Sequence, residues 1–147
     1  MDEGPRFFTI EEANALVASL ELEFGRIAQA RSELGPLIQA LGGPDEAVAI
    51  LHDDAPTPPG REPEVEKLRR AADEITAAVE RVNALGCLVK DVEAGLVDFY
   101  AMVDDEPAFL CWQYGERAIS HWHALGEGYA GRKPIEGAPV PPPAFLN

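Results

Sequence analysis

Apolar residues recur at alternating steps of three and four along residues 10–41, which is the spacing of one face of a helix. Thr9 and Glu12 form a capping box at the start of this stripe, because each side chain can accept from a backbone N–H that the first turn leaves unpaired. Pro36 removes a backbone donor and crowds the preceding turn. The pattern therefore predicts a helix over residues 9–41 that is kinked or divided near Pro36.

A second stripe with the same spacing runs over residues 63–85, and Pro63 suits the first turn of a helix. Residues 42–62 between the stripes are rich in glycine, proline and aspartate, and they predict a mobile loop. Two stripes joined by a connection that can reverse direction predict a long antiparallel helical hairpin. The stripes are expected to pack on each other, and apolar surface left over could pair two copies of the chain.

After Gly86 the hydrophobic period changes to two, which is typical of strands. Three short runs rich in valine, leucine and aromatic residues predict three strands: Cys87–Val92, Leu96–Val103 and Ala108–Trp112. Asp104 and Asp105 are expected to form a tight turn between the last two strands, although neither residue is the glycine that such turns favour. With a two-residue turn, Val103 pairs with Glu106.

The remaining segments complete the predicted outline. Residues 116–125 have helical spacing and predict a short helix, so residues 86–132 form a β-rich module, and residues 133–147 are a proline-rich tail. A length of 147 residues suits a single domain. The predicted fold is of the α+β class and mainly α, with a helical hairpin, a small antiparallel three-stranded sheet and a short C-terminal helix.

The charge of the chain narrows its expected partners. Twelve basic and 26 acidic residues give a net charge of −14, which repels nucleic acid and anionic lipid surfaces. No apolar run is long enough to span a bilayer, and the first residues lack the features of a signal peptide. Cys87 and Cys111 are expected to be free thiols. We therefore expect an acidic, soluble, cytoplasmic protein without nucleic-acid or membrane partners.

The predicted β-rich module contains the side chains that are best suited to bind a ligand or to take part in a reaction. The two-residue turn would place Asp98 directly opposite Cys111, whereas a change of one residue in that turn would separate them. On the expected helix, Glu116 and His123 are seven residues apart and share a face. Carboxylate, thiol and imidazole donors together fit zinc or iron. Our sharpest hypothesis is a metal site made from Glu116, His123, Asp98 and Cys111.

Two other interpretations of these residues remain open. In the first, Asp98 and Glu116 are held by Lys90, Arg132 or backbone donors in a structural polar network, since a buried carboxylate needs such partners. In the second, Arg132 and Lys90 bind a small anion beside Gly128 and Gly131. No motif of a catalytic nucleophile occurs, so no catalytic residue can be assigned.

Several strings resemble a bacterial family, the domain of unknown function family 2203. They are Phe7-Phe8-Thr9, Glu11-Glu12-Ala13-Asn14, Val89-Lys90-Asp91, Gly95-Leu96-Val97-Asp98-Phe99, Leu110-Cys111-Trp112, Gly115-Glu116, Trp122-His123 and Gly128-x-x-Gly131-Arg132. The resemblance spans nearly the whole chain and implies a prokaryotic cytoplasmic setting, but it implies no activity. The chain departs from the family pattern at Asp105, where a turn glycine is usual.

Two classes of function follow from the sequence. The first is an interaction protein that self-associates through its helical hairpin, which the heptad spacing favours. The second is a metal-binding protein or metal-dependent enzyme with its site in the C-terminal module.

Overall fold

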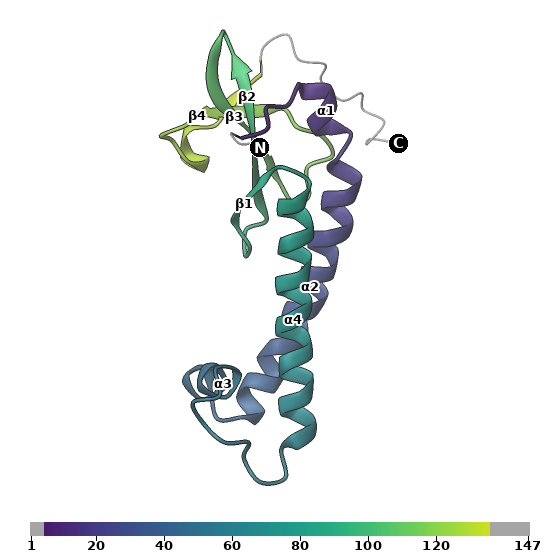
Figure 1. Ribbon diagram of the computed structural model, residues 1–147, viewed down its shortest axis with the longest axis vertical. Coiled ribbons are helices and arrows are strands. Elements are labelled where there is room, and N and C mark those ends of the chain that lie inside the picture. Colours follow the sequence, from purple (N-terminus) through teal and green to yellow (C-terminus); the bar gives the residue numbers. More distant parts are fainter. Residues whose placement is uncertain (1–4, 136–147) are drawn as a thin grey trace. The chain divides into compact units, whose positions relative to one another are not determined.

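The computed structural model describes residues 5–135 and divides the chain into two compact units (Figure 1). The first, called the sheet unit here, combines Met1–Phe24 with Val79–Asn147. The second, called the helical unit, is Gly25–Ala78. Two long helices, α2 (Val17–Ala40) and α4 (Glu62–Ala84), contribute residues to both units.

The chain begins with the short helix α1 (Ile10–Asn14), and the predicted capping box is confirmed. Glu12 N donates to Thr9 Oγ1 over 3.0 Å, and Thr9 N donates to Glu12 Oε1 over 2.9 Å. The predicted run over residues 9–41 is divided at residues 15–16, between α1 and α2, whereas α2 continues through Pro36. A division at Pro36 is therefore wrong.

Packing explains why α2 tolerates Pro36. A proline inside a helix costs about 3 kcal/mol. Three apolar residues beside it, Leu34, Leu37 and Ile38, pack against the core of the helical unit. Their burial offsets the lost hydrogen bond, so tertiary contacts outweigh the local preference.

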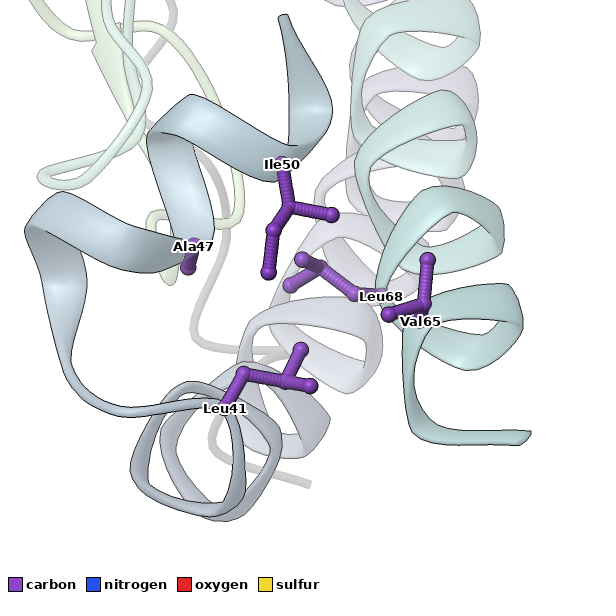
Figure 2. Packing of buried hydrophobic residues seen from close by; sticks show 5 residues of the cluster. All are labelled: Leu41, Ala47, Ile50, Val65 and Leu68. Carbon is purple, nitrogen blue, oxygen red and sulfur yellow. The ribbon is translucent and has the colours of Figure 1, made fainter. Parts of the chain in front are cut away.

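The helical unit contains a helix that the sequence did not predict, α3 (Pro44–Leu51), within the expected loop over residues 42–62. Its Ala47 and Ile50 are buried and point toward Leu41, Val65 and Leu68 (Figure 2). The start signals are proline in the first turn followed by two acidic residues. Turn-forming residues on both sides of α3 concealed these signals. The prediction that the whole segment is a loop is wrong.

The second long helix, α4, agrees with the predicted range of 63–85 to within one residue at each end. Within the helical unit it runs antiparallel to α2 (Figure 1). Arg69 of α4 holds the end of α3, because its guanidinium donates to the carbonyl of Ile50 over 2.9 Å and pairs with Asp53 at 3.0 Å. The predicted hairpin of two long helices is thus present in this unit.

The sheet unit contains an antiparallel meander with the strand order β1-β2-β3-β4-β5. The strands are β1 (Leu88–Asp91), β2 (Leu96–Val103), β3 (Glu106–Gln113), β4 (His121–Ala124) and β5 (Lys133–Pro134). Within residues 5–135 the sheet therefore has five strands, and the expectation of three strands is wrong. A one-turn 3₁₀ helix, η1 (Tyr129–Gly131), precedes β5.

The expected helix over residues 116–125 is also wrong, because β4 occupies its second half. Ile119 and His123 are both buried, but they lie in a loop and a strand rather than on one face of a helix. The free edge of β3 accepts this segment, so that Phe109 pairs with His123 and Cys111 pairs with His121. Strand β4 has only four residues, which are too few to show an alternating pattern when the surrounding segment also fits a helical spacing.

The β2–β3 register agrees with the sequence prediction. Val103 pairs with Glu106, and Asp98 pairs with Cys111. Asp104 and Asp105 both have positive φ angles, 53° and 66°, which define the turn as type I′. The prediction of a two-residue turn is therefore confirmed, and aspartate occupies positions that favour asparagine and glycine.

The two faces of the sheet have different roles, since side chains alternate along each strand. One face is apolar and packs against the N-terminal segment and α2, as shown by Phe99 against Phe8 at 5.0 Å and Trp112 against Phe24 at 5.8 Å between ring centroids. The opposite face carries Asp98, Cys111 and His123, whose paired positions follow from the register. The candidate site is on this second face.

Candidate functional site

Three potential metal ligands from three adjacent strands converge on the polar face of the sheet. Asp98 lies on β2, Cys111 on β3 and His123 on β4. One donor atom from each side chain lies within 4.8 Å of the other two. The exposed fractions are 3% for Asp98, 1% for Cys111 and 2% for His123, so the cluster is almost completely removed from water.

The hydrogen bonds of His123 determine its tautomer. Nδ1 lies 2.9 Å from the carbonyl oxygen of Ala124, and because a carbonyl oxygen accepts, Nδ1 carries the hydrogen. Nε2 then points at Asp98, at 3.2 Å from Oδ1 and 3.1 Å from Oδ2. A lone pair facing a carboxylate is repulsive. A proton or another cation must therefore lie between His123 and Asp98.

Lys90 provides a positive charge beside the cluster. Its Nζ donates to Asp98 Oδ2 over 3.0 Å and lies 4.1 Å from the centroid of the Phe109 ring. The side chain of Lys90 is 42% exposed, whereas that of Asp98 is 4% exposed. The ammonium group therefore neutralises a buried carboxylate while keeping contact with solvent.

Cys111 is a neutral thiol in these surroundings. Burial raises its pKa to about 12, and the neighbouring Asp98 carboxylate contributes to the rise. At neutral pH such a thiol is a poor nucleophile. Both ring nitrogens of His123 are engaged as well, so the imidazole is not placed to activate the thiol. The arrangement does not fit a cysteine–histidine catalytic pair.

A cavity of about 230 Å³ adjoins the cluster. Asp98, Cys111 and His123 form part of its wall, together with Lys90, Asp91, Leu96, Glu127, Gly128 and Tyr129. Tyr129 is oriented by its hydroxyl, which donates to Gln113 Oε1 over 3.1 Å, and Glu127 pairs with Lys133 at 3.0 Å. The buried donors therefore have access to a space large enough for a small molecule.

Glu116, which we expected as a ligand, has a different role. Arg132 Nη2 donates to both of its carboxylate oxygens, over 2.9 Å and 2.8 Å, and Gln113 N donates to Oε1 over 2.8 Å. Its backbone carbonyl accepts from Trp112 Nε1 over 2.9 Å. Glu116 is thus not part of the group of donors within 4.8 Å, and it ties the loop after β3 to Arg132.

The two cations of the hypothetical anion site are both paired with carboxylates, Lys90 with Asp98 and Arg132 with Glu116. These are the pairs expected for a structural polar network. Burial alone would lower the pKa of Arg132, but the Glu116 carboxylate outweighs this effect and raises it. Arg132 Nη2 also donates to the Cys111 carbonyl over 3.3 Å, while its Nε is buried without a hydrogen-bond partner among residues 5–135.

Sequence reasoning missed Glu127 and Tyr129 as residues of the cavity wall. They follow β4 directly, and that strand was expected to be a helix. The signal that could have located them is the Gly128-x-x-Gly131 string, because a Cβ at Gly131 would lie 2.8 Å from the Glu127 side chain, so glycine permits this close approach.

These features define a class: an α+β protein whose antiparallel five-stranded sheet is apolar on one face and carries a buried aspartate–cysteine–histidine cluster on the other. The chain belongs to the family described as uncharacterized conserved protein (DUF2203), whose model matches residues 6–135. The resemblance noted from the sequence is thereby confirmed. No curated protein and no solved structure matches the chain.

No helix within residues 5–135 combines the length and the apolar character that crossing a bilayer requires.

Proposed function

We propose that this protein binds one divalent transition metal ion, zinc or iron, through Asp98, Cys111 and His123. The observation that carries the proposal is the convergence of three buried donors of different chemistry within 4.8 Å. Burying a carboxylate, an imidazole and a thiol together costs free energy unless they are paired or hold a metal. Glu116 is not included, because its carboxylate is already engaged by Arg132.

The donor distances support this set. Metal bonds of 2.0–2.3 Å at tetrahedral angles place donor atoms about 3.3–3.6 Å apart. His123 Nε2 and the Asp98 oxygens, at 3.1–3.2 Å, are already near that separation. Small rotations of the Cys111 and Asp98 side chains would close the remaining distances. The bond from His123 Nδ1 to a backbone carbonyl is the orienting contact usual for a metal-binding histidine.

The electrostatics of the cluster are also consistent with a metal ion. A divalent cation would replace the proton between His123 and Asp98, and it would stabilise Cys111 as a thiolate despite the raised pKa of the free thiol. Lys90 would have to leave Asp98, which its exposed side chain permits. Sulfur, nitrogen and oxygen donors together favour zinc or iron over magnesium or calcium.

Three protein ligands leave a tetrahedral ion with one open position, which is the pattern of catalytic rather than structural zinc sites. The cavity beside the cluster supports access to that position. We therefore propose a metal-dependent enzyme or a sensor of a metal-bound small molecule, in preference to a purely structural site.

The test is elemental analysis of the full chain purified without a histidine tag and then reconstituted with zinc or with iron(II). We expect one ion per chain in the wild-type protein and a loss of binding of at least tenfold for His123→Ala, Asp98→Asn and Cys111→Ser. Glu116→Gln is expected to retain the ion. The control is His52→Ala, because His52 ends α3 in the helical unit and is exposed.

Substoichiometric metal that His123→Ala does not change would refute the proposal. Loss of metal in Glu116→Gln, with His123→Ala unaffected, would refute the ligand set.

Self-association through the helical stripe is a second candidate with less support. Val17, Leu20, Phe24 and Ile27 of the stripe are buried within one chain. Among the large apolar residues on the α-helices of residues 5–135, Leu22 of α2 and Val48 of α3 are exposed. Light scattering at low and high concentration tests it, and a strict monomer would exclude it. A cytoplasmic setting is likewise proposed, supported by two free buried thiols. The charge of −14 supports the expected absence of nucleic-acid partners.

A further inference from the structure

The residues that line the cavity beside the cluster indicate the kind of ligand that the cavity would bind. Its wall combines the three buried donors with the ammonium group of Lys90, the edge of Tyr129 and the backbone of Gly128. We propose that it binds a small carboxylate monoanion, with one oxygen at the open position of the metal and the other accepting from Lys90. This inference rests on the metal site proposed above.

The charges around the cavity favour a single negative charge. Lys90 is the one basic residue in the described wall of the cavity, and its ammonium group loses its Asp98 partner when that carboxylate binds an ion. Glu127 is neutralised by Lys133 at 3.0 Å. Asp91 is exposed and its Oδ1 accepts from Ala94 N over 2.8 Å, so water screens it. A monoanion matches the single ammonium group of the wall, whereas a dianion such as hydrogen phosphate carries a second charge that has no cationic partner there.

The position of Lys90 gives it a direct role in holding the ligand. In the structure Nζ contacts Asp98 Oδ2 at 3.0 Å and the face of Phe109 at 4.1 Å. When a metal takes the Asp98 oxygen, the ammonium group loses its partner while it still borders the cavity. A carboxylate bound to the metal offers its second oxygen as a replacement, which forms a charge-assisted hydrogen bond.

The size of the cavity suits a short acid. A volume of about 230 Å³ corresponds to roughly seven or eight waters in the liquid. Leu96 and the ring of Tyr129 supply apolar surface for a short hydrocarbon part.

The experiment uses the full chain loaded with cobalt(II), whose visible absorption reports on the ligands of the ion. Acetate is the probe, acetamide is its neutral counterpart, and phosphate is the dianion. We expect acetate to shift the cobalt bands in a saturable manner and acetamide to leave them unchanged at the same concentration. Lys90→Met is expected to weaken acetate binding about tenfold or more.

Two controls separate this inference from the metal site. Cobalt uptake by Lys90→Met should be at least as tight as in the wild-type protein, because the substitution removes a cation that competes for Asp98. Lys67→Met, which changes an exposed lysine of α4 in the helical unit, should leave acetate binding unchanged.

The outcomes distinguish the two proposals. Absence of cobalt bands in the wild-type protein would overturn the metal site, and this inference with it. Cobalt bands that acetate does not shift, or acetate binding that Lys90→Met does not weaken, would overturn the ligand inference alone. Phosphate that binds more tightly than acetate would overturn the assignment to a carboxylate.

Discussion

His123 Nε2 lies 3.1 Å from Asp98 Oδ2, and neither side chain exposes more than 4% of its surface. Because Nδ1 donates to the Ala124 carbonyl, the contact needs a hydrogen or a metal between the two residues. Asp98 therefore affects two separate properties, the affinity for a metal ion and the stability of the metal-free fold. Different substitutions of Asp98 should change these two properties to different extents.

We expect Asp98→Asn to change the free energy of unfolding of the metal-free protein by less than about 1 kcal/mol. The amide can donate to His123 Nε2 and accept from Lys90, so neither partner is left unsatisfied. Asp98→Leu should lower the free energy of unfolding by about 2–3 kcal/mol, chiefly because His123 Nε2 becomes buried and unpaired. Urea unfolding in the presence of a chelator measures both, and an Asn variant as unstable as the Leu variant would contradict this account.

The buried thiol of Cys87 should make the free energy of unfolding depend on pH. Burial raises its pKa from 9.0 to about 11, against smaller opposing effects of a backbone hydrogen bond and Arg6. The unfolded thiol ionises at lower pH than the folded one, so the stabilisation is complete below pH 9 and is lost as pH rises toward 11. The shift corresponds to roughly 3 kcal/mol.

Urea unfolding at pH 7, 9 and 11 should therefore show a steeper loss of stability in the wild-type protein than in Cys87→Ala. The two proteins share every other titrating group, so the difference between their slopes isolates the thiol. Equal slopes would show that Cys87 does not resist ionisation in the fold.

A substitution in the turn between β2 and β3 should increase the stability of the protein. Asp105 has a φ angle of 66°, which costs a non-glycine residue about 1 kcal/mol, and Asp-Gly is among the sequences that type I′ turns prefer. We expect Asp105→Gly to raise the melting temperature of the protein by a few degrees. Asp53→Gly is the matched control, because Asp53 has a φ angle of 59° but also pairs with Arg69. An equal gain from both variants would mean that backbone strain alone decides the outcome.

Arg69 and Arg70 are neighbours on α4 with very different contacts. Arg69 donates to the Ile50 carbonyl and pairs with Asp53 at the end of α3, whereas Arg70 pairs with Glu66 on the surface, where both side chains are 70% exposed. We expect Arg69→Ala to cost about 1 kcal/mol and to increase hydrogen exchange in α3. Arg70→Ala should cost less than about 0.5 kcal/mol. Unchanged exchange in α3 after Arg69→Ala would contradict a capping role.

The β2–β3 pairing could be predicted because two independent signals agree. Alternation marks each strand, and the number of residues between Val103 and Glu106 sets the register, so the meeting of Asp98 and Cys111 followed without knowledge of the rest of the sheet. Long amphipathic helices such as α4 are predictable for a similar reason, since many positions repeat one spacing.

The segment after β3 could not be predicted, because its structure depends on contacts rather than on local preference. Ile119 is fixed by the side chain of Asn14, whose Oδ1 accepts from Ile119 N over 2.7 Å across 105 positions of sequence. Strand β4 forms on an edge that β3 offers. Glu116 was mistaken for a ligand for the same reason: its partner Arg132 is brought near by β4 and β5, which have no strong pattern of their own.

The type I′ turn at Asp104 and Asp105 has a consequence for recognising the same chemistry in other proteins. Facing donors on a hairpin depend on register, since a slip of the β2–β3 pairing by one residue would turn either Asp98 or Cys111 to the apolar face. A search for proteins with this site should therefore first require the two donors of the hairpin to lie equally far from the turn, as Asp98 does from Val103 and Cys111 from Glu106. Chains that keep all three donors but place the aspartate and the cysteine at unequal distances from the turn would be false positives of any search based on residue identity alone.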